Sequence, residues 1–214
     1  MGDKWTLLIV RDLLSGPRRF VELQRVLPGI STEQLRSRLN RMVADGMLTR
    51  KRYREVPPRV DYELTERSRE LAPVLGQLAR WGYDWAWSPP RTSERVDLGA
   101  IFRLVPGLVS ADANLFGTVD LEVTDGPSGA SVYRVTLSGA SAEITEAVDD
   151  ESPDAAVSAP TSAWVRALGP TGEREGMRTS GDAALASALL DLLSSGEGHA
   201  MVAEPARDLE SAAG

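Results

Sequence analysis

The strongest constraint on this chain is a break at two adjacent prolines, Pro89 and Pro90, which separates a basic half from an acidic half. Proline lacks the backbone N–H that helices and strands need, and polar residues flank the pair, so we interpret residues 88–96 as a linker. Residues 1–95 contain 18 Lys and Arg against 12 Asp and Glu, whereas residues 96–214 contain 6 against 19. This asymmetry predicts a module that binds a polyanion, joined to a domain that does not.

The composition narrows the class of protein further. A chain of 214 residues is long enough for two domains, and the absence of cysteine excludes disulfides and thiol catalysis. The single histidine, His199, removes most catalytic sites that depend on imidazole, and no apolar run is long enough to span a membrane. No secretory leader is readable, so we expect a cytoplasmic protein that is not an enzyme and needs no cofactor or metal. The formal net charge of -7 does not argue against nucleic acid, because the halves differ in sign.

The basic half has the pattern of a winged helix-turn-helix domain over residues 1–87. Apolar residues recur at helical spacing in three short segments, and the third begins with Ser31 and Gln34 in a capping-box pattern and ends at Gly46. Two strands follow, and Thr65 is expected to begin a long helix that reaches Trp87. The expected helices cover residues 5–13, 20–27, 31–45 and 65–87, and the expected strands cover residues 47–54 and 59–64.

The third helix has the residue pattern of a helix that enters the DNA major groove. At 100° per residue Leu35, Leu39 and Met42 share its inner side, whereas the outer side carries short polar and basic residues. Arginine, glutamine and serine can all bond base edges. The alternative is an amphipathic helix whose outer side is merely solvated.

The hairpin after this helix favours DNA binding. Arg50, Arg52 and Arg54 alternate along one strand, so they share a face, and Arg59 begins the return strand. Such a cluster of like charges is destabilising unless an anion faces it, and DNA phosphates supply one. We expect Arg38 to read a base and Arg52 to lie over phosphates. Arg18 and Arg19, at the start of the second helix, are expected to add phosphate contacts.

Several short motifs of this half also occur, in the same order, in one family of regulators. They are GDKWTLLI (2–9), GPRRF (16–20), EL (22–23), PGIS (28–31), RL (38–39), DG (45–46), VPPRVDYELT (56–65) and WG (81–82). Residues 1–87 therefore resemble the HxlR family of bacterial winged-helix transcription regulators. The resemblance implies a homodimer that binds DNA.

Three departures from the family pattern limit what the resemblance implies. Members usually begin earlier, with a short helix and often a cysteine, so this chain is expected to lack residues before Met1. Without cysteine, the thiol sensing of some relatives is not expected. Arg36 stands where a serine is common, which leaves the base preference open.

The last helix of the basic half carries an apolar stripe that predicts a dimer interface. Its residues recur at spacings close to a heptad, although only about two heptads are present. The alternative is that the stripe packs on its own domain. The predicted interface residues are Leu71, Val74, Leu78, Trp81 and Trp85.

The acidic half predicts a small α+β domain over residues 97–198, followed by a disordered tail at 199–214. A helix bent at Pro106 is expected over residues 98–109, strands over 118–124, 131–138 and 140–145, and helices over 161–168 and 182–193. The segments PDAAVS (153–158) and GDAAL (181–185) are similar to sterol-carrier-protein-2-like (SCP2-like) domains. This resemblance implies a lipid-carrier-like fold with an apolar tunnel, and it assigns no ligand residues.

Two groups of residues in this half have competing interpretations. Asp149, Asp150 and Glu151 could be imagined as a metal site, but a solvated acidic loop is the preferred interpretation, and His199 is expected to be an exposed spectator. A set of larger side chains lines either a ligand pocket or simply the core: Phe102, Phe116, Tyr133, Trp164 and Met177.

Together these patterns predict a bacterial transcription regulator, a repressor rather than an activator. It would bind pseudo-palindromic double-stranded DNA as a homodimer, with a hydrophobic small molecule as a possible effector in the C-terminal domain. The alternative is a lipid or small-molecule carrier, or a scaffold, whose basic half does not read DNA. The predicted DNA contacts are Arg18, Arg19, Thr32, Gln34, Arg36, Ser37, Arg38, Arg41, Arg52, Arg54 and Arg59.

Overall fold

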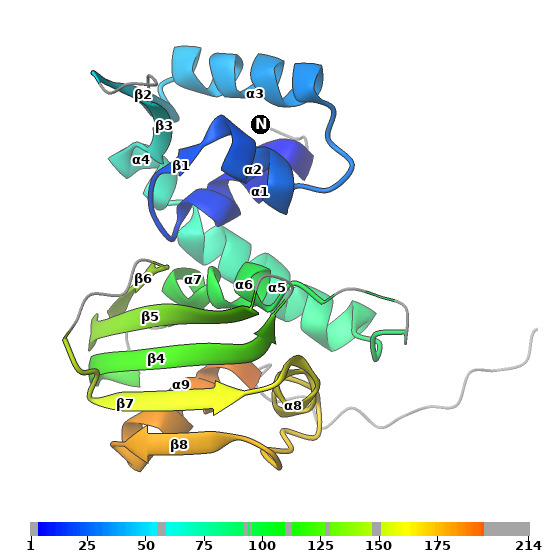
Figure 1. The fold of residues 1–214 in the computed structure, drawn as a ribbon, viewed down its shortest axis with the longest axis vertical. Helices are drawn as coiled ribbons and strands as arrows, with labels where there is room; N and C mark the ends of the chain where they lie inside the picture. The colour runs from blue at the N-terminus through cyan, green and yellow to red at the C-terminus, as the bar shows by residue number, and fades with distance from the viewer. Residues whose placement is uncertain are drawn as a thin grey trace, which may run out of the picture.

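The computed structural model of the chain describes residues 4–54, 59–91, 94, 96–109, 113–126, 129–146 and 151–194. Helices and a small sheet form the N-terminal half, a larger sheet forms the C-terminal half, and the long helix α5 lies between them (Figure 1). Within the described residues no helix is long and apolar enough to cross a membrane. The predictions for the turn at 55–58, for Asp149 and Asp150, and for His199 and the tail at 199–214 lie outside these residues.

The N-terminal half is a winged helix-turn-helix, as predicted. Its three strands pair antiparallel in the order β1-β3-β2. The core between the helices and this sheet is made of fully buried aliphatic side chains such as Ile9, Leu23 and Leu35. The elements are α1 (Lys4–Leu13), β1 (Arg18–Arg19), α2 (Phe20–Val26), α3 (Thr32–Ala44), β2 (Leu48–Tyr53), β3 (Arg59–Leu64), α4 (Glu66–Arg69) and α5 (Ala72–Ala86).

Helix α3 begins and ends where its sequence predicts. The Ser31 hydroxyl accepts a hydrogen bond from the backbone N–H of Gln34 at 3.1 Å, and the Gln34 side chain accepts one from the Ser31 N–H, also at 3.1 Å. This reciprocal capping box satisfies two backbone donors that the helix itself cannot. After the helix, Gly46 has φ +69°, a left-handed conformation that glycine adopts without strain. Local chemistry therefore fixes both ends of α3.

The expected long helix from Thr65 to Trp87 is wrong, because the chain forms two helices there. Pro73 lies in the first turn of α5, where its missing N–H is tolerated but from which a helix cannot extend backwards unbroken. The Thr65 hydroxyl does not cap α4; it donates to the carbonyls of Gly46 and Met47 at 2.9 and 3.1 Å. Arg19 is the N-cap residue of α2, in agreement with its predicted place at the start of the second helix, and the dipeptide Arg18–Arg19 also forms β1 against β3.

The C-terminal half is an α+β domain built on a five-stranded sheet of order β6-β5-β4-β7-β8. Among the strands that the structure describes, only β4 and β7 pair in parallel. Alternate residues such as Val119, Val135 and Val157 are buried against the helices, whereas the other face of the sheet is open toward the viewer (Figure 1). The elements are α6 (Leu98–Phe102), α7 (Val105–Leu108), β4 (Leu115–Gly126), β5 (Gly129–Gly139), β6 (Ser141–Thr145), β7 (Ala155–Ala159), α8 (Thr161–Ala167), β8 (Arg178–Gly181) and α9 (Ala183–Ser194).

Two expectations for this half need correction. Residues 98–109 form two short helices instead of one bent helix, because Pro106 lies in the first turn of α7. Strands β7 and β8 were not expected, and the four residues of β8 are all exposed and carry no apolar alternation. The core interpretation holds for Phe102 and Trp164, which are fully buried and stack edge to face at 4.9 Å.

The two halves meet closely where α5 crosses α7. A Cβ atom on Gly76 would overlap the backbone carbonyl of Gly107, and a Cβ on Gly107 would overlap that of Ala72. Two facing glycines therefore allow a backbone approach that no other residue permits. The N-terminal part of α5 is consequently fixed against the C-terminal half.

A buried group of charges also joins the halves. Arg103, at the end of α6, donates to Asp12 of α1 at 3.0 Å and to Glu146, after β6, at 2.7 Å. Arg18 also pairs with Glu146, and its Nε donates to the Asp12 carbonyl at 2.7 Å. The Asp12 and Arg103 side chains are 0% and 4% exposed, so neither charge can be satisfied by water. We call Asp12, Arg18, Arg103 and Glu146 the junction charges.

Burial and partner charges act against each other within this group. Burial raises the pKa of Asp12 despite the neighbouring Arg11 and Arg103. Burial also opposes ionisation of Glu146, but the charges of Arg103 and Arg18 outweigh it and lower the pKa of Glu146. Glu146 is therefore the carboxylate of the group whose ionised form the fold favours.

We expect Gly76→Ala to destabilise the chain by about 1–3 kcal/mol, because the added methyl group forces α5 and α7 apart. Urea unfolding followed by circular dichroism measures the change. The matched control is Gly82→Ala in the same helix, where a Cβ meets nothing within 4 Å; it is expected to stabilise by up to about 1 kcal/mol. Equal effects of the two variants would contradict the close helix crossing.

We expect Glu146→Gln to lower the free energy of unfolding by about 1–2 kcal/mol at pH 7, since its side chain is 32% exposed and only part of the ion-pair energy is lost. The folded-state pKa of Glu146 lies below its ordinary value of 4.5, so its contribution is present above that pH and is lost as the pH falls through the lowered value. The difference between the two proteins should therefore shrink from pH 5 toward pH 3. Glu143→Gln, an exposed change on β6, is the control and should show no such convergence.

Candidate nucleic-acid interface

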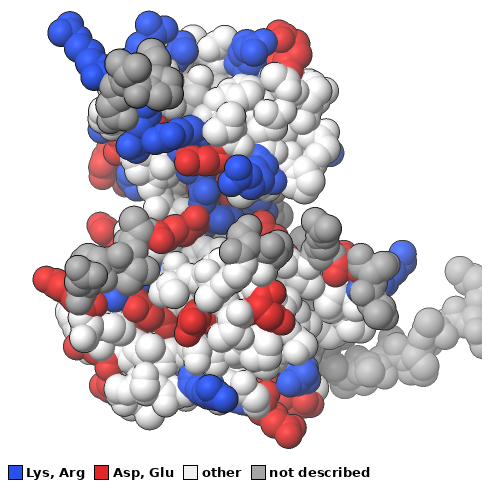
Figure 2. Space-filling view, viewed as in Figure 1, with Lys and Arg blue, Asp and Glu red and all other residues white. Residues whose placement is uncertain are grey.

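Lys and Arg side chains gather on the outer end of the N-terminal half, over α3 and β2, whereas Asp and Glu side chains spread over the C-terminal half (Figure 2). The predicted charge asymmetry is thus also a spatial one. Among the described residues, no group of three or more His, Asp or Glu side chains could hold a metal ion. The gathering of Lys and Arg side chains makes the basic end of the molecule the candidate site.

Helix α3 presents its polar side to solvent. Leu35, Leu39 and Met42 are buried beneath it, and its outward residues are exposed. Ser37 lies in the middle of the outward side, and Arg41, one turn on, has a side chain that is 74% exposed and 3.7 Å from Asp45. Arg36, on the flank, donates to Glu33 at 3.1 Å and lies over the Phe20 ring. These side chains can reach a macromolecule that approaches from outside.

A polar hollow of about 290 Å³ separates α3 from the wing strands. Arg36 and Asn40 line it from the helix, and Arg50, which lies over the Tyr62 ring, lines it from β2. Arg52 shares the sheet face of Arg50, because their partners Val60 and Tyr62 are two residues apart on β3. The hollow thus joins helix and wing into one basic surface.

Carboxylates neutralise some of the predicted DNA contacts and leave others unpaired. Asp61, which is buried, pairs with Arg59 through Nε at 2.9 Å and lies 3.9 Å from Arg19. On the same sheet face Lys51 pairs with Glu63, whose hydrogen bond and charge raise the Lys51 pKa. Arg50, Arg52 and Arg54 have no carboxylate partner within the part of the chain that the structure describes. The arginines without a carboxylate partner therefore lie on the other face of the β2 hairpin arm, next to α3.

The remaining predicted contacts are placed less favourably. Thr32 accepts a hydrogen bond from Gln24 at 2.6 Å, and the Gln34 side chain is used by the capping box. Arg38 is half-buried on the flank opposite Arg36. Arg18 is not part of this surface: its side chain is 11% exposed and belongs to the junction charges.

The predicted interface residues of α5 form an exposed stripe, with one exception. Val74, Leu78, Trp81 and Trp85 are 51–70% exposed, whereas Leu71 packs against the core of its own half. Within the described residues the interpretation that the whole stripe packs on its own domain is therefore wrong. An exposed apolar stripe of this kind marks an interaction surface.

Sequence reasoning placed Arg50 on the basic face of the wing but did not predict that it meets Asn40 of α3. Only the packing of α3 against β2 brings the two side chains to one hollow. Arginine and asparagine together can bond guanine and adenine edges as well as phosphates. The surface has the charge and the side chains of a DNA-binding face.

Fold and surface together define a winged helix-turn-helix protein with an additional α+β half. Residues 1–89 match the HxlR-like helix-turn-helix family, and the chain belongs to that family. It is 44% identical over 85 residues to the HTH-type transcriptional regulator sll1512 of Synechocystis sp., covering 40% of this chain and 63% of that protein. It is 40% identical over 82 residues to the regulator YkvN of Bacillus subtilis, covering 38% of this chain and 70% of that protein.

A solved structure is also similar to the N-terminal half. The redox regulator HypR, in its reduced form, is 37% identical, with 39% of this chain and 82% of that chain covered and a TM-score of 0.37. All of these matches cover about two fifths of this chain, so they concern its basic half.

Proposed function

We propose that this protein is a DNA-binding transcription regulator. The observation that carries the proposal is the continuous basic surface of α3 and β2, where Arg50, Arg52 and Arg54 have no carboxylate partner among the described residues. Relatives of the N-terminal half that are HTH-type transcriptional regulators support it. The protein would act in the cytoplasm of a bacterium, where its DNA target lies.

In this proposal α3 lies in the major groove and the wing contacts the backbone. Ser37, Asn40 and Arg41 face outward and would meet base edges. Arg50 and Arg52, on the wing face next to the hollow, would lie over the phosphates that border the groove. Arg19 and Arg59 would contribute less, because Asp61 already offsets their charge.

We also propose that two copies associate through the exposed stripe of α5. Val74, Leu78, Trp81 and Trp85 offer a compact apolar surface with two indoles, the residue type that dominates protein interfaces. A symmetric dimer would place two α3 helices on half-sites about one helical turn apart, roughly 34 Å, in pseudo-palindromic DNA. Repression is the simpler outcome, because occupancy of the operator alone is sufficient for it.

For the C-terminal half we retain the proposal of an SCP2-like, carrier-related domain that responds to a hydrophobic molecule. The helices cover one face of its sheet, and the fully buried Phe102 and Trp164 fill the core beneath it. None of the five large side chains predicted as pocket candidates lines the cavity of about 410 Å³ between α5 and the acidic half. A carrier that binds no DNA would not explain the basic surface of α3 and β2.

The first test separates base readout from phosphate contact on an operator selected from random duplexes. We expect Arg41→Ala to weaken binding by about 1–3 kcal/mol and to relax discrimination at one position. Arg52→Ala should weaken all sequences similarly and reduce the salt slope by about one per half-site. Fluorescence anisotropy at several salt concentrations measures both quantities.

Arg178→Ala is the matched control for this test, because Arg178 is exposed on β8 in the acidic half. It should leave operator affinity unchanged. Affinity of the unaltered chain that does not fall with salt, or an equal loss in the Arg178 variant, would refute the proposed DNA interface.

The second test concerns dimerisation. We expect Trp81→Glu to weaken the dimer about 30-fold or more, since a charged side chain in the apolar stripe removes an interface anchor worth about 2 kcal/mol. Sedimentation equilibrium measures the association constant. Phe116→Glu, at an equally exposed aromatic residue in the other half, is the control and should leave the constant unchanged. A monomeric unaltered chain at all concentrations would contradict the proposed dimer.

A further inference from the structure

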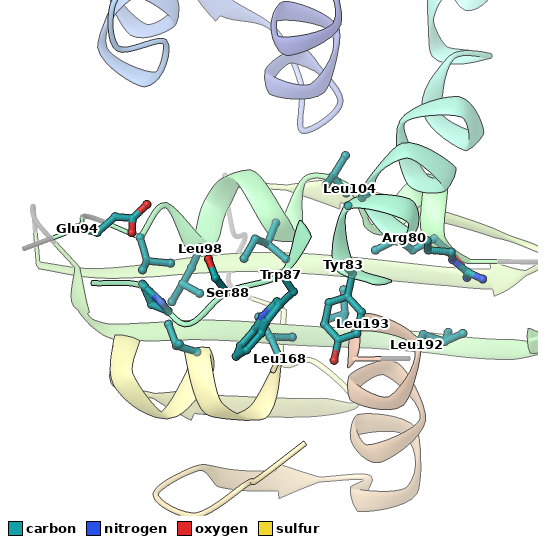
Figure 3. Close-up of a pocket in the computed structure, with 17 residues that line it drawn as sticks. Arg80, Tyr83, Trp87, Ser88, Glu94, Leu98, Leu104, Leu168, Leu192 and Leu193 are labelled. Atoms are coloured by element: carbon teal, nitrogen blue, oxygen red, sulfur yellow. The ribbon is translucent and has the colours of Figure 1, made fainter. Parts of the chain in front are cut away.

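A cavity of about 410 Å³ lies between the C-terminal part of α5 and the acidic half (Figure 3). Helix α5 and the segment after it form one wall, α6 and α7 the second, and the ends of α8 and α9 the third. Its apolar lining residues include Trp87, Leu98, Leu104, Val165, Leu168 and Leu193. A volume of this size is in the range of sites that bind small organic ligands.

The polar groups of the lining are few and their charges balance. Arg80 donates to the carbonyl of Leu108 at 2.7 Å, and Glu94 accepts from the N–H of Arg91 at 3.2 Å. Burial, with the nearby charge of Asp84, raises the pKa of Tyr83, so its hydroxyl stays neutral. No hydrogen bond to this hydroxyl comes from any residue in the described ranges. Such a lining suits an uncharged molecule that is mostly apolar and carries one hydrogen-bonding group.

The cavity and the exposed stripe lie on opposite sides of the same helix. Ala79 and Tyr83 face the cavity, whereas Leu78, Trp81 and Trp85 lie about half a turn away and face solvent. The glycine crossing at Gly76 and Gly107 fixes the helix one turn before the cavity begins. A molecule in the cavity would therefore bear on the C-terminal half of α5, beyond its fixed point.

We propose that this cavity is the binding site for a small, uncharged, mostly apolar organic molecule. Its occupancy sets the position of the C-terminal half of α5 and hence the geometry of the exposed stripe. The proposal of a binding site depends only on the cavity, whereas the proposed effect on DNA affinity also rests on the proposed function.

The site is tested on the full chain without DNA, with N-phenyl-1-naphthylamine, an uncharged aromatic probe whose fluorescence rises in apolar surroundings. We expect saturable binding of one probe per chain. Gly82→Leu should reduce probe affinity at least tenfold: Gly82 lines the cavity, and a Cβ there meets nothing within 4 Å. Val165→Phe, which narrows the cavity from α8, should have the same effect.

Gln77→Leu is the matched control, since it adds the same side chain to an exposed position of α5 that does not line the cavity. It should leave probe affinity unchanged. Circular dichroism confirms that each variant is folded. Absence of probe binding, or equal affinity in all four folded proteins, would overturn the proposed site.

The effect on DNA is measured by titrating the selected operator with and without saturating probe. We expect the probe to change operator affinity by about 5- to 150-fold in the unaltered chain and not in Gly82→Leu. An unchanged operator affinity at full probe occupancy would overturn the coupling and leave the site in place. Failure of the chain to bind any operator would instead refute the proposed function, and the probe result would stand without it.

Discussion

The arrangement of the two halves depends on the ion pairs that the guanidinium of Arg103 makes. It is almost fully buried and is held by Asp12 from the first helix and by Glu146 from the end of β6. A buried charge is tolerated only when its partners are in place, so the loss of one partner is destabilising. The positions of α1, the α6–α7 turn and β6 are therefore interdependent. These ion pairs, and not only the segment after α5, hold the basic end and the acidic half in one arrangement.

Ion pairs with carboxylates also determine which positively charged side chains remain available to a ligand. Glu146 pairs with Arg18, and Asp61 pairs with Arg59 and lies within ion-pair distance of Arg19. What remains is the face of β2 that carries Arg50 and Arg52, next to the outward side of α3. A charge count over the basic half therefore overstates how many arginines can meet phosphate. The distribution of acidic partners concentrates the positive potential where helix and wing meet.

The parts of the fold that depend on local chemistry could be predicted from the sequence. The ends of α3 follow from Ser31, Gln34 and Gly46, and the wing strands follow from their alternation and flanking turn residues. Pro73 and Pro106 also act locally, but Pro73 was placed inside one long helix and Pro106 was interpreted as a bend, whereas each lies in the first turn of a new helix. Whether a helix is interrupted at a proline depends on the backbone conformation of the residues before it, and the apolar spacing of the sequence does not reveal that conformation.

The rest depended on contacts between residues far apart in the chain. Asp12 and Arg103 are 91 residues apart, and neither stands in a motif that predicts a buried pair. Arg18 shares a dipeptide with Arg19, yet one is buried at the junction and the other is half-exposed on the wing side. Strand β8 is polar and exposed, and it is a strand only because β7 offers it an edge. Periodicity cannot reveal such features, because their cause lies in another part of the sequence.

The sequence divides at Pro89 and Pro90, but helix α5, which precedes these prolines, contacts both halves of the folded molecule. Ala72 and Leu75 complete the core of the basic half, while Gly76 lies against α7 of the acidic half. Further along, Tyr83 lines the cavity above the acidic half and Trp81 faces solvent. One helix thus completes the core of the basic half, contacts the acidic half through Gly76, and separates the cavity from an exposed apolar stripe. Because its first turns are fixed and its last turns border the cavity, a molecule bound there would act on the end that carries Trp81 and Trp85.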